Sequence, residues 1–452
     1  MSRTELCVIA AGCLLVLGLV LGSIAAHAEQ TSERDTDRIE ALERRVDELE
    51  QSEAGQEGAA VPAWLPEWAQ RVRLGGSASV GYFRRGNLSP EDQDAFEVWD
   101  TRLFVDAELA EDVEVADTTV VRNIGATVEW DLVRVGELQN QVGELYADFQ
   151  GLAGSSWLNA QVGRFQIPLG ENYLRYSKGY RDNPFISNTV GGPWWWDEGV
   201  RLYGQDAGAR VGYVASISNG ETPFNFDSNT DPQGTLKLYT DPWPWLRVSV
   251  SGLASGEIGR TSAASEGALW LGETWATPVG LFTDVPSFID GIPFDDAPNV
   301  IDHTWFVGAD TVVKPLDGLR IWLAGGQYHV EAEGGGPYDR DLYYWVAEIV
   351  AEGRLVAPAL DPLYLALRAN GLTTADAGRG YVLHYHLAET VGYNMRDLNE
   401  LSAALGVRIG KYVVLRGEYA FQDVDLVRGV TSDIHAAAGD NHWFAFDVGV
   451  AF

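Results

Sequence analysis

The feature that most constrains this chain is a two-residue alternation in its last stretch, His442–Phe452, which reads HWFAFDVGVAF. Phenylalanine and valine occupy every second position from Phe444 to Phe452, and the positions between them hold Trp, Ala, Asp and Gly. Successive side chains of a β-strand point to opposite faces, so one face of this strand is purely apolar and the other is mixed. Such a strand fits a soluble sandwich or a barrel whose apolar face meets lipid.

The same alternation recurs from Val72 onward, for example in Trp99–Leu109, Leu145–Phe149 and Ala209–Ile217, and we count roughly sixteen or seventeen such segments. About 24 residues per strand with its loop suits sixteen strands of about 10 residues, the length of a tilted membrane strand. Beyond residue 28 no apolar run is long enough for a membrane helix. A closed barrel is the other structure that satisfies backbone polar groups in lipid. We therefore predict an all-β, antiparallel transmembrane barrel of about 16 strands over residues 72–452.

Residues 1–28 predict a secretory signal peptide. Arg3 precedes an apolar run from Val8 to Ile24, and Ala26-His27-Ala28 supplies small residues for cleavage after Ala28. A retained membrane anchor is the alternative. Both cysteines, Cys7 and Cys13, fall in this segment, so the rest of the chain has neither disulfides nor thiolate sites.

Residues 29–51 predict a periplasmic coiled-coil helix that trimerises the chain. The apolar residues repeat at the a and d spacing of a heptad: Ile39, Leu42, Val46 and Leu49. Two heptads alone are marginally stable, so this helix would depend on copies already held together. The alternative is a short solvated helix or a disordered spacer. Residues 52–71 are expected to be a linker, rich in Gly and Ala and then in Pro.

The charge balance and the residue types exclude several functions. Lys and Arg number 32 against 65 Asp and Glu, a net charge of −33, which argues against a nucleic-acid partner. His384 and His386 share a strand face, yet two histidines make no metal site without a well-placed third ligand. Neither a phosphate loop nor a nucleophile elbow is present. We therefore expect no catalytic site, no cofactor and no bound metal.

Several stretches resemble the phosphate-selective porin family of Gram-negative outer membranes: Val72–Gly76, Phe96–Leu109, Val162–Glu171 and Glu198–Gly204. The resemblance extends over about residues 72–452, and the N-terminal helix is similar to that of related dicarboxylate-type porins. It implies a homotrimer of sixteen-stranded barrels in the outer membrane, with the coiled coil in the periplasm. Phe452, which closes the last strand, resembles the C-terminal signature of bacterial outer-membrane β-barrels and is the expected assembly signal. Phosphate as the solute does not carry over, because the chain has only four lysines: Lys178, Lys237, Lys314 and Lys411.

If the apolar parity faces lipid, the opposite parity lines the pore. That parity predicts a set of lumen arginines and acids, namely Arg102, Arg201, Arg210, Arg247, Arg320, Arg368, Arg408, Arg416, Asp100, Asp106 and Glu108. Rows of arginine facing rows of carboxylate would orient charged solutes. The alternative is that individual arginines pair with lumen acids and only support the wall. Two long connections, Pro168–Trp196 and Gly256–Asp302, are extracellular or fold back to narrow the channel.

These observations predict a passive outer-membrane porin for small charged hydrophilic solutes, preferentially organic or inorganic anions, with lipid and the solute as partners. Two alternatives remain: a structural outer-membrane anchor with a trimerising helix, and a cation-preferring general porin. A barrel-borne hydrolase would need a Ser, His and acid set on one rim.

Overall fold

The structure, a computed structural model, describes residues 71–84, 95–116, 118–134, 137–171, 183–193, 196–206, 208, 210–220, 231–257, 269–272, 274–277, 301–332, 339–374, 381–386, 389–393, 395–426 and 439–451. The expected signal peptide and coiled coil, residues 52–70 of the linker and Phe452 lie outside these residues. Within them, no helix is both long and apolar enough to cross a membrane.

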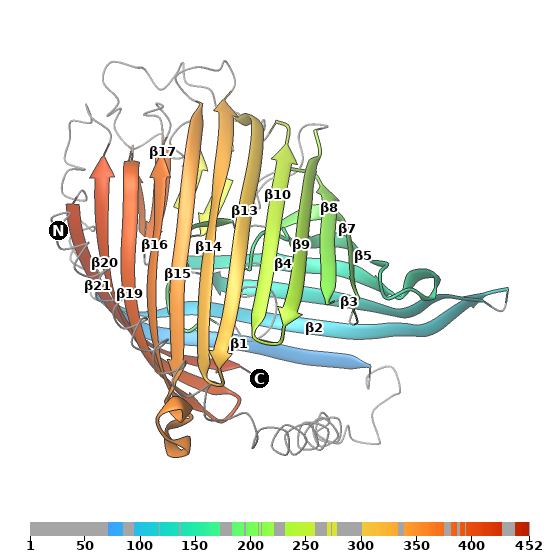
Figure 1. Cartoon of the computed structure of the whole chain (residues 1–452), viewed down its shortest axis with the longest axis horizontal. Coiled ribbons are helices and arrows are strands. Elements are labelled where there is room, and N and C mark those ends of the chain that lie inside the picture. The colour runs from blue at the N-terminus through green and yellow to red at the C-terminus, as the bar shows by residue number, and fades with distance from the viewer. Residues whose placement is uncertain are drawn as a thin grey trace, which may run out of the picture. The chain divides into compact units, whose positions relative to one another are not determined.

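Sixteen strands close into one antiparallel barrel, in which each strand pairs with the next and β21 pairs with β1 (Figure 1). In order around the barrel they are β1 (Val72–Arg84), β2 (Ala95–Val115), β3 (Thr118–Arg134), β4 (Glu137–Gln150), β5 (Asn159–Gln166), β7 (Trp196–Asp206), β8 (Val211–Ser218), β9 (Gln233–Trp243), β10 (Leu246–Ser255), β13 (Ile301–Leu316), β14 (Leu319–Ala332), β15 (Arg340–Glu352), β16 (Leu363–Thr374), β19 (Met395–Ile409), β20 (Val413–Leu426) and β21 (Gly439–Ala451). The predicted all-β barrel is confirmed.

The long connections carry strands of their own. β6 (Val190–Pro193), β11 (Leu269–Gly272), β12 (Thr274–Thr277), β17 (Tyr381–His386) and β18 (Glu389–Tyr393) form a second sheet in the order β18-β17-β12-β11-β6. Short 3₁₀ turns complete two strand connections: η1 (Leu152–Gly154), η4 (Gly353–Leu355) and η5 (Pro358–Leu360). The two longest predicted loops therefore each contribute to this second sheet, through β6 and through β11 and β12.

Strand connections differ at the two ends of the barrel. At the end where β1 begins, here called the turn end, only Pro244-Trp245 separates β9 from β10, and Asp317-Gly318 separates β13 from β14. Gly318 adopts φ of +86° in its turn, a left-handed conformation that costs glycine little. The longest connections, those between β5 and β7, between β10 and β13 and between β16 and β19, lie at the opposite, loop end. The β2–β3 hairpin extends past its neighbours at the turn end (Figure 1).

Along β21 the side chains alternate between exposed and buried, as the sequence pattern predicts. Phe444, Phe446, Val448 and Val450 are exposed, whereas Trp443, Ala445, Asp447, Gly449 and Ala451 are buried. Five outward apolar residues of other strands are likewise 46–61% exposed, namely Leu103, Val250, Val307, Leu365 and Leu405. Soluble monomers rarely expose a contiguous apolar surface of this extent. A closed ring without strand edges and with an apolar exterior is suited to lipid.

The outward face yields a direct prediction. Val307, in the middle of β13, is 61% exposed, and Val356, in the turn between η4 and η5, is 83% exposed. Val307→Arg places a charge in the hydrocarbon region and is expected to destabilise the barrel by about 2–4 kcal/mol. Val356→Arg, the control, should change stability by less than about 1 kcal/mol. Urea unfolding in lipid vesicles measures both, and equal effects of the two substitutions would contradict a lipid-facing exterior.

Candidate functional site

The connection between β5 and β7 returns into the barrel. Its described residues, 167–171 and 183–193, are here called the inner segment, and nearly all of them are buried, including Leu169, Phe185 and Val190. Their partners are side chains on the inward-facing parity of the barrel strands. The sequence predicts that this connection is either extracellular or folded back into the channel. Its described residues are folded back into the barrel.

The first end of the inner segment is bound to β9, β10 and β13. The ammonium of Lys237 donates to the carbonyl of Gly170 at 2.6 Å and pairs with Glu171 at 3.0 Å. The Gly170 N–H donates to Ser251 Oγ at 3.0 Å, and the Glu171 N–H donates to Asp310 at 3.2 Å. These contacts satisfy backbone groups that would otherwise be buried without a partner.

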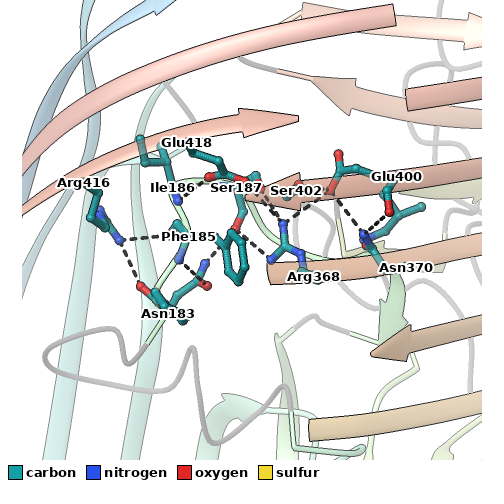
Figure 2. A network of polar contacts seen from close by, with 12 residues as sticks. Asn183, Phe185, Ile186, Ser187, Arg368, Asn370, Glu400, Ser402, Arg416 and Glu418 are labelled. Atoms are coloured by element: carbon teal, nitrogen blue, oxygen red, sulfur yellow. Dashed lines mark hydrogen bonds and ion pairs between the residues drawn. The ribbon is translucent and has the colours of Figure 1, made fainter. Parts of the chain in front are cut away.

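The second end is bound to β16, β19 and β20 (Figure 2). The Glu418 carboxylate accepts the N–H groups of Ile186 at 2.6 Å and Ser187 at 2.9 Å, and it also accepts the Ser187 hydroxyl at 2.6 Å. Arg368 donates to the Ser187 carbonyl at 3.3 Å and lies 3.4 Å from Glu400. One carboxylate and one guanidinium thus provide acceptors and donors for the same turn of backbone.

Arg416 and Tyr364 extend this contact. Arg416 donates to the carbonyls of Asn183 at 3.2 Å and Phe185 at 3.0 Å (Figure 2). Asp447 accepts from the Nε of Arg416 at 2.9 Å. The Tyr364 hydroxyl donates to the carbonyl of Pro184 at 3.0 Å. Buried charges are stable only when they are paired and hydrogen-bonded. Arg368 and Arg416 meet both conditions by holding the inner segment.

Arg102 is enclosed in the wall itself. Its fully buried guanidinium lies 3.0 Å from Asp100, 3.0 Å from Glu129 and 3.6 Å from Asp131. Arg201 is different, because its guanidinium lies over the rings of Tyr146 and Phe165, with centroids at 5.8 and 4.9 Å. Arg201 also donates to Gln161 at 2.7 Å and to the carbonyl of Gln166 at 3.0 Å. Four of the predicted pore arginines, Arg102, Arg201, Arg368 and Arg416, are therefore buried among protein groups.

The remaining predicted arginines lie closer to the turn end. Arg247, Arg320 and Arg408 are partly exposed and approach carboxylates at 2.7, 3.5 and 2.9 Å, those of Asp241, Glu348 and Glu352 respectively. Arg210 is an exposed turn residue with φ of +54°, because β8 begins one residue later, at Val211. Asp100 is buried, and Asp106 and Glu108 are partly exposed.

Two groups of exposed or partly exposed charges, here called the basic wall and the acidic wall, lie on opposite sides of the barrel. Arg247, Lys314 and Arg320 occupy β10, β13 and β14, and Asp106, Glu108 and Asp148 occupy β2 and β4. β13 is eight places from β2 in the ring of sixteen strands, so the two groups face each other across the barrel. The inward parity also predicts Glu418 as a lumen acid, and the structure places its carboxylate on the inner segment. The sequence did not single out Lys237 or Lys314 as site residues, although each falls on the inward parity of its strand.

No set of three or more His, Cys, Asp and Glu side chains among the described residues is arranged to hold a metal ion. The side chains of His384 and His386 lie outside that description.

Comparison with known proteins places the fold but no closer relationship. No protein-family model matches this chain, and no curated protein matches it in sequence. The solved structure of OmpT, an outer membrane protein of Vibrio cholerae, is similar with a TM-score of 0.54 and 11% identity, over 84% of this chain and 97% of that one. The trimer form of OmpT is similar with a TM-score of 0.52 and 10% identity, over 84% of this chain and 99% of that one.

The outer membrane channel DcaP of Acinetobacter baumannii is similar at a TM-score of 0.51 and 12% identity, over 84% of this chain and 97% of that one. At such identities these likenesses show a shared barrel architecture. They do not distinguish a phosphate-selective family from other outer-membrane barrels.

Glu418 provides a test of how the inner segment is held. Glu418→Gln removes a charged acceptor of three hydrogen bonds, and hydrogen bonds to charged groups contribute about 1.5–3 kcal/mol. Hydrogen exchange at the amides of Ile186 and Ser187 should accelerate by about 10–100-fold. Glu111→Gln, on the exposed β2–β3 hairpin, is the control and should leave these rates unchanged. Unaltered exchange in the Glu418 variant would show that the carboxylate does not hold the segment.

Proposed function

We propose that this protein is a passive outer-membrane porin for small charged hydrophilic solutes. The observation that carries the proposal is the inner segment, which is bound inside a closed barrel of sixteen strands. Barrels of this size leave an aqueous channel, and a segment fixed across the interior narrows it. Solutes then pass between walls of opposite charge without covalent chemistry, and binding must be weak enough for release.

We infer that anions are preferred. Two of the three carboxylates on the acidic wall are hydrogen-bonded, Asp106 by Thr127 at 2.6 Å and Asp148 by Tyr203 at 2.8 Å. On the basic wall, the ammonium of Lys314 makes no polar contact with the described part of the chain. Its charge is therefore available to a passing anion. A cation-preferring general porin is the second candidate, and Glu108 supports it as a partly exposed acid on the opposite wall.

The proposed location is the outer membrane, with the turn end toward the periplasm and the loop end toward the exterior. The resemblance to trimeric porins and the heptad pattern of residues 29–51 support a homotrimer. The apolar exterior provides the surface that lipid would cover.

Recording in planar bilayers tests the channel. Purified protein should give stepwise conductance, and under a salt gradient the reversal potential should have the sign of chloride selectivity. Glu108→Gln removes a carboxylate from the acidic wall and should shift that potential further toward chloride. Glu114→Gln, on the exposed hairpin, should not shift it. A folded but electrically silent protein would contradict the porin, and a potential of the opposite sign would favour the cation-preferring candidate.

Native mass spectrometry tests the assembly, and three chains per particle are expected. Replacing Leu42 and Val46 together by Asn weakens the predicted apolar seam and should lower the temperature at which trimers dissociate. Glu48→Gln changes a position outside that seam and is the control. A monomer at all temperatures, or identical dissociation of both variants, would contradict the trimerising helix.

A further inference from the structure

A cavity of about 480 Å³ lies inside the barrel near the turn end. Arg247, Lys314 and Arg320 line it from three neighbouring strands, β10, β13 and β14, and Glu171 of the inner segment borders it. We propose that this cavity binds a small monocarboxylate with an apolar body. The inference rests on the proposed porin function, because it specifies a solute class that pauses in that channel.

Each carboxylate that lines the cavity is already close to a basic side chain of the protein. Asp241 pairs with Arg247 at 2.7 Å, and Glu348 lies 3.5 Å from Arg320. Glu171 pairs at 3.0 Å with Lys237, which lies outside the lining. The cation that remains is Lys314, whose ammonium contacts no polar group in the described ranges. The lining therefore carries one uncompensated positive charge, which matches a single carboxylate.

The donors that remain lie close together. Arg247 directs its Nε and Nη2 to Asp241, and its guanidinium lies over the ring of Tyr239 at 5.4 Å. Its Nη1 group is left for a ligand among the described residues. Arg247 pairs with Val312 across β10 and β13, and Lys314 is two residues further along β13. Such diagonal neighbours have Cα atoms about 7–8 Å apart, within reach of long side chains. One carboxylate can therefore accept from both.

The rest of the lining is apolar. Trp322, paired with Val312 in the sheet, is one side, and Trp245 and Leu246 form part of another. Ligand sites of a few hundred Å³ combine such apolar walls with a small number of polar groups that fix orientation. A hydrated inorganic anion would make no favourable contact with the tryptophans. A cation would compete with the basic side chains that already lie close to every lining carboxylate. An organic acid uses both parts of the lining.

Phenylacetate is the probe, with phenylacetamide as its uncharged counterpart and inorganic phosphate as an anion without an apolar body. Each is titrated by calorimetry into the full chain in detergent and is added to either side of an open channel in a bilayer. Phenylacetate should bind and interrupt the current at lower concentration than the other two. Lys314→Gln should raise the dissociation constant for phenylacetate about tenfold, because a charged hydrogen bond is lost. Lys314→Arg retains the charge and should restore binding.

Lys411→Gln is the matched control, because Lys411 is also exposed at the turn end but lies in the β19–β20 connection, outside the cavity. Equal affinity for phenylacetate and phenylacetamide, or equal effects of Lys314→Gln and Lys411→Gln, would overturn the proposed site and leave the porin intact. A silent channel whose calorimetry still shows the Lys314-dependent preference would support the site and contradict the porin.

Discussion

Backbone hydrogen bonding in lipid is the constraint on which this structure depends. A bilayer offers no water to unpaired N–H and C=O groups, so a chain of strands can span it only as a closed ring. The pairing of β1 with β21 closes that ring, with Ser77 opposite Ala451 and Arg84 opposite Phe444. Once the ring is closed, alternation sends one parity to lipid and the other to the interior. The exterior becomes apolar, and the charges collect inside.

The charged side chains inside the barrel bind the inner segment because its buried backbone groups also need hydrogen-bond partners. A connection that enters the barrel brings backbone groups that need partners. Glu418 accepts two of its N–H groups, and Arg416 donates to two of its carbonyls. The cost of burying these charges is offset by neighbouring charges and by the backbone they bind. The narrowing of the proposed channel and the stability of the wall thus depend on the same side chains.

The sequence predicted the barrel well, because alternation with a period of two is a local property and each strand shows it. It predicted the candidate site less well. Arg368 and Arg408 both occupy inward positions, yet the Arg368 side chain is 0% exposed and that of Arg408 is 34% exposed. The difference arises because Ser187, distant in sequence, lies against Arg368. The alternation along a strand identifies which side chains point into the barrel. It does not predict which of these side chains are covered by another segment of the chain. The location of Arg210 in a turn depended similarly on where β8 begins.

The central claim is that the apolar parity of the strands touches lipid and the other parity surrounds the interior. Residues 72–452 contain no cysteine, so single cysteines carrying spin labels can be placed along β21 without background. Labels at 444, 446, 448 and 450 should be accessible to oxygen dissolved in lipid, and labels at 445, 447 and 449 should be shielded from it. Oxygen accessibility that does not alternate from one residue to the next would contradict the account. So would a water-soluble relaxation agent that reaches all labels from 444 to 450 equally.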